Sequence, residues 1–112
     1  MPGNGRKEPD VEGKELLGCL KRRHCGKRKA VKSSVLEARF NVSGKELRDA
    51  VNALRRAQHP ICSDEDGYYY AQSSQEIAAT IQQLHNRIAG IAAAHDGLYI
   101  AYLRFVQGGG GD

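Results

Sequence analysis

A mostly helical α+β fold is predicted by three patterns that follow one another along this chain of 112 residues. Two short helix patterns, at residues 34–40 and 43–56, are separated only by the turn Asn41-Val42. Two short apolar runs on either side of Asp66-Gly67 then predict a β-hairpin. From Ser73 to about Val106, apolar residues recur every three or four positions, which predicts a single long helix. The expected architecture is a winged helix-turn-helix with a long C-terminal coiled-coil-like helix.

Composition divides the chain into four expected parts. Residues 1–10 contain two prolines, two glycines and no apolar pattern, so we expect a disordered arm. Residues 11–72 form the winged helix-turn-helix domain, residues 73–106 the long dimerisation helix, and residues 107–112 a glycine-rich flexible tail. No run approaches the ~20 apolar residues of a membrane helix, and no signal peptide is visible. We therefore expect a cytoplasmic protein.

Local signals place the elements at the start of the domain. Val11, Leu16, Leu17 and Leu20 share one helical face, which predicts a first helix over residues 11–23 that ends before Gly26. Residues 30–32 are expected to be extended, where a winged helix has its first strand. Three later helix starts carry the Ser-x-x-Glu pattern of a capping box, each Ser cap contributing about 1 kcal/mol. These pairs are Ser34 with Glu37, Ser43 with Glu46, and Ser73 with Glu76.

The positive charge gathers around the helix-turn-helix. Residues 1–72 contain 15 Lys and Arg against 10 Asp and Glu, whereas residues 73–112 contain 2 against 3. Residues 21–32 include seven Lys and Arg and no acid, which suits a surface that binds phosphates, although solvated charge explains it too. The candidate phosphate contacts are Lys27, Arg28, Lys29, Lys32, Ser43, Arg55 and Arg56.

The second helix of the motif has one apolar face and one polar face. Leu47, Val51 and Leu54 recur at helical spacing and are expected to face the core. The candidate base-reading residues lie opposite them and are Arg48, Asn52 and Lys45. Arg can bind guanine and Asn can bind adenine through paired hydrogen bonds in the major groove. Glu46 and Asp49 lie nearby and weaken this interpretation, and a merely solvated face would show the same mixture.

The hairpin carries unusual side chains at its turn and on its return strand. The loop 63–67 contains three consecutive acids at positions 64–66, which phosphates would repel, so we expect this wing to stay out of the minor groove. Tyr68, Tyr69 and Tyr70 alternate faces along the second strand. They can stack on bases, but filling the core and covering the outer face of the strand is the favoured interpretation.

Neither a metal site nor an enzyme site is indicated. Three cysteines in a chain without a secretory signal favour reduced thiols. A zinc site built from Cys19, His24, Cys25, His59 and Cys62 is conceivable, but no Cys-x2-Cys pair exists. No nucleophile with a base and an orienting group stands out, and no cofactor is expected.

The C-terminal pattern is a seam with spacings of four and three residues over four heptads. Its members are Ile77, Ile81, Leu84, Ile88, Ile91, His95, Leu98, Tyr102 and Phe105. Such a seam indicates a coiled coil, and we expect a homodimer through this helix. His95 is either a pH-sensitive device that fixes the register or a simple hydrogen-bonded histidine. A break at Asp96-Gly97, folding the helix back on itself, is the alternative.

Residues 34–43, with Leu47, Val51, Ile61 and Gly67-Tyr68-Tyr69, resemble the N-terminal winged-helix domain of biotin ligase repressors. They are also similar to small helix-turn-helix proteins of phages and prophages, over roughly residues 14–72. The resemblance implies DNA binding through the helix 43–56, without biotin chemistry because no ligase domain follows. Gln58 departs from the pattern, since such domains often have Gly there.

These observations predict a sequence-specific duplex DNA-binding protein that acts as a dimer. The resemblance suggests a phage or prophage transcriptional regulator. The alternative is a protein-interaction adaptor, in which the winged helix is a scaffold and the long helix docks a partner protein.

Overall fold

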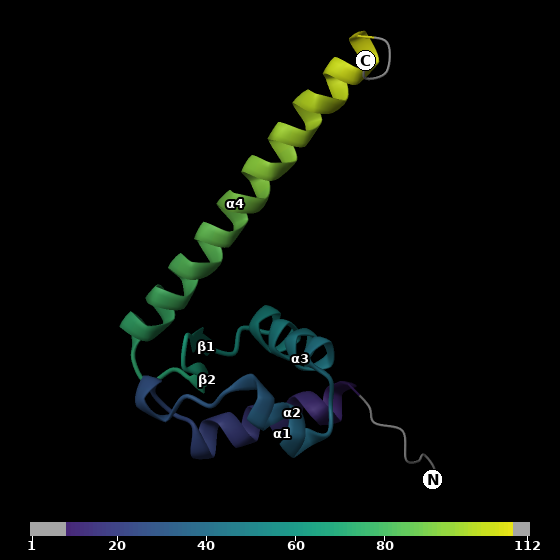
Figure 1. Cartoon of the computed structure of the whole chain (residues 1–112). Coiled ribbons are helices and arrows are strands. Elements are labelled where there is room, and N and C mark those ends of the chain that lie inside the picture. The colour runs from purple at the N-terminus through teal and green to yellow at the C-terminus, as the bar shows by residue number, and fades with distance from the viewer. Residues whose placement is uncertain (1–8, 109–112) are drawn as a thin grey trace. The chain divides into compact units, whose positions relative to one another are not determined.

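The computed structural model describes residues 9–108 and is mostly helical, with one two-stranded antiparallel sheet (Figure 1). Its elements are α1 (Pro9–Arg23), the 3-10 turn η1 (Lys27–Lys29), α2 (Ser33–Phe40), α3 (Gly44–Arg56), β1 (Ile61–Asp64), β2 (Gly67–Tyr70) and α4 (Ser74–Gln107). The expected arm is too long by two residues, because Pro9 and Asp10 already belong to α1, and residues 1–8 lie outside the described part. Gln107, expected in the tail, is the last residue of α4.

The described residues form two compact units, which divide between Thr80 and Ile81. The first unit extends past the expected domain boundary at residue 72 and includes the first residues of α4. The second unit contains the rest of α4.

The core of the first unit is built by α1, α2, α3 and the inner face of the hairpin. The face of α3 that was expected to be apolar is confirmed as buried, since Leu47, Val51 and Leu54 are each at most 8% exposed. Leu36 of α2 is fully buried with them. The remaining buried members of this cluster are Leu16, Cys19, Leu20, Val31 and Ile61. Burial of this one apolar face fixes which side of α3 remains in water.

The hairpin is tighter than the sequence suggested. β1 pairs with β2 in the register Ile61 with Tyr70 and Asp64 with Gly67, which leaves only Glu65 and Asp66 in the turn. Gly67 has a φ of 125°, and a Cβ there would collide with the carbonyl of Val31, so this position requires glycine. Val31 forms a two-way backbone bridge with Tyr68, as expected for the short extended piece at residues 30–32.

The outer face of the hairpin is covered by a second, smaller buried cluster. Tyr69 and Cys62 are 2% and 1% exposed, and Thr80 of α4 is 4% exposed. Thr80 Oγ1 accepts a hydrogen bond from Ser63 N at 3.3 Å and lies 3.5 Å from Ser63 O. Tyr69 is therefore a structural residue, as the sequence interpretation favoured.

Only one of the three expected capping boxes forms completely. Ser43 and Glu46 exchange both hydrogen bonds at the start of α3, which confirms that box. The box at Ser34 is wrong, because α2 begins one residue earlier and Lys32 is its N-cap. At the start of α4, Ser73 Oγ accepts from Glu76 N, but the Glu76 carboxylate accepts hydrogen bonds from Gln72 N and Lys27 N. That carboxylate joins η1 to the start of α4.

The end of α3 shows how Gln58 replaces glycine. Gln58 N donates to Arg55 O and His59 N donates to Leu54 O, the two hydrogen bonds of a Schellman motif. Gln58 has a φ of 76°, so it adopts the left-handed conformation that glycine usually supplies there.

α4 is a single helix of 34 residues that continues through Gly90 and Gly97 (Figure 1). The alternative of a break at Asp96-Gly97 is therefore wrong. Neither glycine would bring an added Cβ within 4 Å of another part of the described chain. No helix in the range 9–108 is both long and apolar enough to cross a membrane.

Candidate nucleic-acid interface

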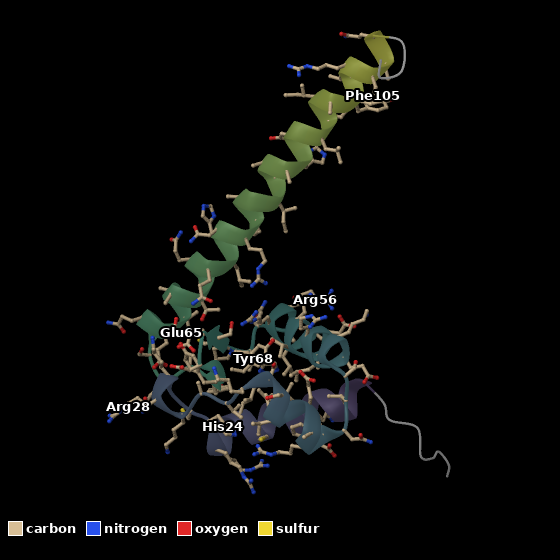
Figure 2. The ribbon with its side chains drawn as sticks, viewed as in Figure 1. His24, Arg28, Arg56, Glu65, Tyr68 and Phe105 are labelled. Carbon is tan, nitrogen blue, oxygen red and sulfur yellow. The ribbon has the colours of Figure 1, made fainter. Side chains whose placement is uncertain are left out.

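The exposed side of α3 presents Arg48 and Asn52 to solvent, four residues apart on the face opposite the core. Among the side chains of residues 13–108, neither has an ion-pair or hydrogen-bond partner, so their donors and acceptors are available to that part of the surface. Arg56 continues the same face one further turn along and is also exposed (Figure 2). The residues predicted to read bases therefore lie together on one accessible helix face.

Lys45 begins this face but is partly engaged. Its ammonium lies 2.8 Å from the carboxylate of Asp49, one turn along the helix. The hydrogen bond and the charge of Lys45 hold the pKa of Asp49 below its usual range, so this carboxylate stays ionised and paired. The pair gives Asp49 a role that the sequence did not suggest, and it lowers the field that Asp49 would exert on an approaching phosphate.

Two other carboxylates lie at the start of α3. Glu46 is held by the capping box, with its Oε1 accepting from Ser43 N at 2.8 Å. Glu37 lies beside Arg48: a Cβ placed on Gly44 would be 3.4 Å from both Glu37 Oε2 and Arg48 Nη1.

The structure divides the predicted phosphate contacts into engaged and available side chains. Lys27 Nζ lies 3.5 Å from Asp64 Oδ2, and Lys32 Nζ donates to Glu65 O at 2.8 Å, so both lysines hold the hairpin. Arg55 is half-buried and donates to Ile61 O and Ser63 Oγ of β1. Ser43 is the N-cap of α3.

The available members of that set are Arg28, Lys29 and Arg56, which are exposed and form no ion pair with any side chain of residues 13–108. Figure 2 shows Arg28 and Arg56 projecting from opposite sides of the first unit. The predicted set is therefore not brought together in one place.

Three arginines that are not among the candidate phosphate contacts lie at or near the end of α1, and one of them, Arg39, contacts His24. Arg39 Nη1 lies 3.2 Å from His24 Nε2 and donates to Cys19 Sγ at 3.1 Å, while His24 Nδ1 lies 2.9 Å from Lys29 O. The two contacts of His24 suit a neutral ring that carries its proton on Nδ1. Arg22 and Arg23 are exposed at the adjacent end of α1. The acid-free run 21–32 contains Arg22 and Arg23, whereas no sequence pattern identified Arg39.

The hairpin turn remains acidic at its tip. Glu65 and Asp66 are exposed, while Asp64 is turned inward and accepts a hydrogen bond from Asp66 N at 2.8 Å (Figure 2). Lys27 and Lys32 offset part of this charge from the side of η1. That the turn stays out of the minor groove remains a prediction.

The expected seam of α4 is largely exposed in the single chain. Ile77 and Leu84 are half-buried, while Ile81, Ile88, Ile91, Leu98, Tyr102 and Phe105 are between 55% and 74% exposed. His95 is 74% exposed and hydrogen-bonded to Asp96. The helix therefore offers an apolar surface that residues 81–108 do not cover themselves.

The cysteines are free thiols, with Cys19 and Cys62 buried. Among residues 9–108, no group of three metal-ligating side chains comes together. Comparisons with protein-family models, curated proteins and solved structures give no match for this chain.

Proposed function

We propose that the protein is a sequence-specific duplex DNA-binding protein of the winged helix-turn-helix class that acts as a dimer. The observation that carries this proposal is the pairing of two faces on α3. One face fills the core, and the other exposes Arg48, Asn52 and Arg56. The regulation of phage or prophage transcription is the role implied by the sequence resemblance.

α3 has dimensions suited to this role. An α-helix is about 10–12 Å across with its side chains, and the major groove is about 12 Å wide, so α3 can lie in the groove along the 20 Å or so that its 13 residues span. Arg48 and Asn52 are one helical turn apart, which brings both side chains to neighbouring base pairs. Arg48 pairs with guanine and Asn52 with adenine, while Arg56 contacts a phosphate at the groove edge.

Dimerisation through the seam of α4 adds specificity. A single α3 reads few base pairs, and two copies related by a two-fold axis read two half-sites. Binding of the second half-site is then favoured by effective concentration. The largely exposed apolar seam of α4 supports this part of the proposal.

Selection of bound fragments from a random duplex pool tests sequence-specific binding directly. Enriched fragments should contain an inverted repeat, and affinity should fall steeply with salt because Lys and Arg release counterions from phosphate. A pool without enrichment, together with duplex affinity no greater than that of a net-neutral control protein, would reject the proposal.

Two single variants then separate base reading from phosphate contact. Arg48→Ala should relax the preference at one position of each half-site and cost about 1–3 kcal/mol on the preferred sequence. Arg56→Ala should weaken all sequences alike and reduce the salt slope by about one. Lys14→Ala, which removes an exposed charge of α1 that is outside the proposed interface, is the control. Equal effects of Arg48→Ala and Arg56→Ala on every sequence would contradict the assignment of Arg48.

The alternative function is a protein-interaction adaptor, which the acidic turn at Glu65 and Asp66 favours. In that case α3 is scaffold and α4 binds another protein. A partner protein that co-purifies in stoichiometric amounts, without retained nucleic acid and with no change on Arg48→Ala, would support the adaptor over DNA binding.

A further inference from the structure

The C-terminal third of α4 exposes more apolar surface than the seam accounts for. In residues 98–106, the seam uses Leu98, Tyr102 and Phe105. Four other large apolar side chains are also exposed: Tyr99 (54%), Ile100 (51%), Leu103 (37%) and Val106 (63%). Exposed contiguous apolar surface of this kind marks an interaction site.

Two of these four side chains point away from the partner helix of a two-stranded coil, and the other two lie at the edge of its seam. With the seam residues at heptad positions a and d, Leu103 occupies position b and Ile100 position f, which point away from the partner in a two-stranded coil. Tyr99 and Val106 occupy position e, at the edge of the seam. Tyr99, Leu103 and Val106 are spaced by four and three residues, so they form a second stripe beside the first.

The second stripe continues toward the middle of the helix with small side chains. Ala89 and Ala92 lie in line with it and permit close helix approach, and Asp96 is its only charged member. A helix whose apolar face covers a, d and e positions is typical of a bundle core, whereas a strict a and d seam is typical of a two-stranded coil.

The scarcity of charged residues and the identity of the seam residues both favour a coil of more than two helices. From Ile88 to Leu103, Asp96 is the only charged residue, although a two-stranded coil has charged residues at its outer positions. Isoleucine occupies both an a position, Ile88, and a d position, Ile91, a combination that favours three or four strands in parallel coils.

We propose that α4 assembles with three further copies into a four-helix bundle, so that the protein is a tetramer made of two dimers. The first seam joins two helices into each dimer. The two dimers are joined through the C-terminal third of α4 by the second stripe, which consists of Tyr99, Leu103 and Val106 with Ile100 beside it. This inference rests on the dimer seam of the proposed function. A tetramer of this kind carries four copies of α3, enough for two operators.

Further copies of this chain fit the stripe better than a membrane surface does. The stripe is continuous with the proposed seam on the same helix, and stacked rings of Tyr99 and Tyr102, with centroids 6.1 Å apart, bridge the two. Helices that lie on membranes carry many Lys and Arg on their polar face. α4 has only Arg87 and Arg104.

The test is the solution mass of the full chain by light scattering after size-exclusion chromatography. We expect the wild-type protein to have four times the mass of one chain. The double variant Ile100→Glu/Leu103→Glu should have two times the mass of one chain. Ile88→Glu, which changes the seam, should have a mass below that of the tetramer. Asn86→Glu, an exposed position outside both stripes, should remain tetrameric. The milder Ile100→Gln/Leu103→Gln pair and circular dichroism check that lost helicity does not explain a smaller mass.

Several outcomes would overturn the inference. These are a dimeric or trimeric wild-type protein, a double variant that stays tetrameric, or a dimeric protein that binds anionic phospholipid vesicles through Ile100 and Leu103. The DNA-binding proposal is judged separately. A dimeric Ile100→Glu/Leu103→Glu variant that still enriches inverted repeats supports both proposals. A tetrameric wild-type protein that enriches no duplex would support the tetramer and reject DNA binding, and a dimeric wild-type protein that enriches inverted repeats would do the reverse.

Discussion

Replacement of Gln58 by glycine should stabilise the protein, although it removes a side chain. Gln58 is the C′ residue of α3, with a φ of 76° and both Schellman hydrogen bonds in place. A left-handed backbone costs a residue with a Cβ about 1–2 kcal/mol. Glycine avoids that cost, but it loses more backbone entropy on folding because its unfolded chain is freer. This entropy loss costs about 0.5–1 kcal/mol more than it does for alanine. The difference predicts a net gain of up to about 1.5 kcal/mol for Gln58→Gly, with a central value of about 0.75 kcal/mol.

The gain can be measured as the change in the midpoint of urea unfolding, followed by far-ultraviolet circular dichroism at constant protein concentration. For a unit of this size, 1 kcal/mol corresponds to about 4–8 °C in Tm, so the thermal shift should be a few degrees. Two matched variants locate the cause. Ala57→Gly, one residue earlier at a φ of −84°, should destabilise. Asn41→Gly, at a φ of 55°, should gain less, because asparagine tolerates this conformation better than glutamine does.

The expected order of stability is Gln58→Gly above wild type and Ala57→Gly below it. If both glycine variants destabilised the protein equally, the backbone of Gln58 would not carry the strain assigned to it. The helix end would then be held by other contacts.

Three further predictions concern the outer cluster of the hairpin and the start of α4. Burial, with the nearby Cys62 and Asp64 adding to it, raises the pKa of Tyr69 from 10.0 to about 12. Neutral Tyr69 therefore stabilises the folded state fully below pH 10, and this stabilisation is lost as the pH rises toward 12. When tyrosine ionisation is followed by absorbance at 295 nm, the step at the highest pH should be missing in Tyr69→Phe. Hydrogen bonds from Gln72 N and Lys27 N hold the pKa of Glu76 in the folded protein below 4.5. Ionised Glu76 therefore stabilises the folded state above pH 4.5, and this stabilisation is lost as the pH falls through the lowered pKa. Glu76→Gln should therefore flatten the acid side of the stability profile, and an unchanged profile would contradict this role. Thr80→Val should cost about 1 kcal/mol in urea unfolding by removing the contacts with Ser63, whereas Thr80→Ser should cost less.

Periodicity was sufficient to predict the elements that bury one face. The apolar spacing of Leu47, Val51 and Leu54 identified both α3 and its buried side, because such a face must be covered in any fold. The apolar spacing from Ile77 to Phe105 continues without a slip, so it predicted one long helix, which the structure has. Two isolated glycines did not interrupt it, since each costs only about 1 kcal/mol in a helix.

Interactions between distant segments could not be read from the sequence. The exact start of a helix was also missed: the Ser34 pattern has the residues of a capping box, but α2 begins at Ser33. Arg55 resembled a phosphate contact because it follows the polar face of α3. Its guanidinium instead reaches Ile61 and Ser63, six and eight residues away. Lys27 and Lys32 similarly bind a hairpin more than 30 residues later, and no local pattern signals that pairing.

The same distant contacts connect the proposed reading helix with the start of α4. Ser63 Oγ accepts from Arg55 of α3 at 3.1 Å, and Ser63 N donates to Thr80 Oγ1 of α4 at 3.3 Å. One residue of β1 is thus bonded to both helices, within the first unit. Because hydrogen bonds fix direction more narrowly than apolar packing does, this link constrains how α3 is held against residues 74–80. Loss of this link should leave the affinity for a single half-site nearly intact, but it should broaden the range of half-site spacings that a dimer accepts. We therefore expect Ser63→Ala and Thr80→Val to change the spacing preference. Arg48→Ala should instead change the base preference.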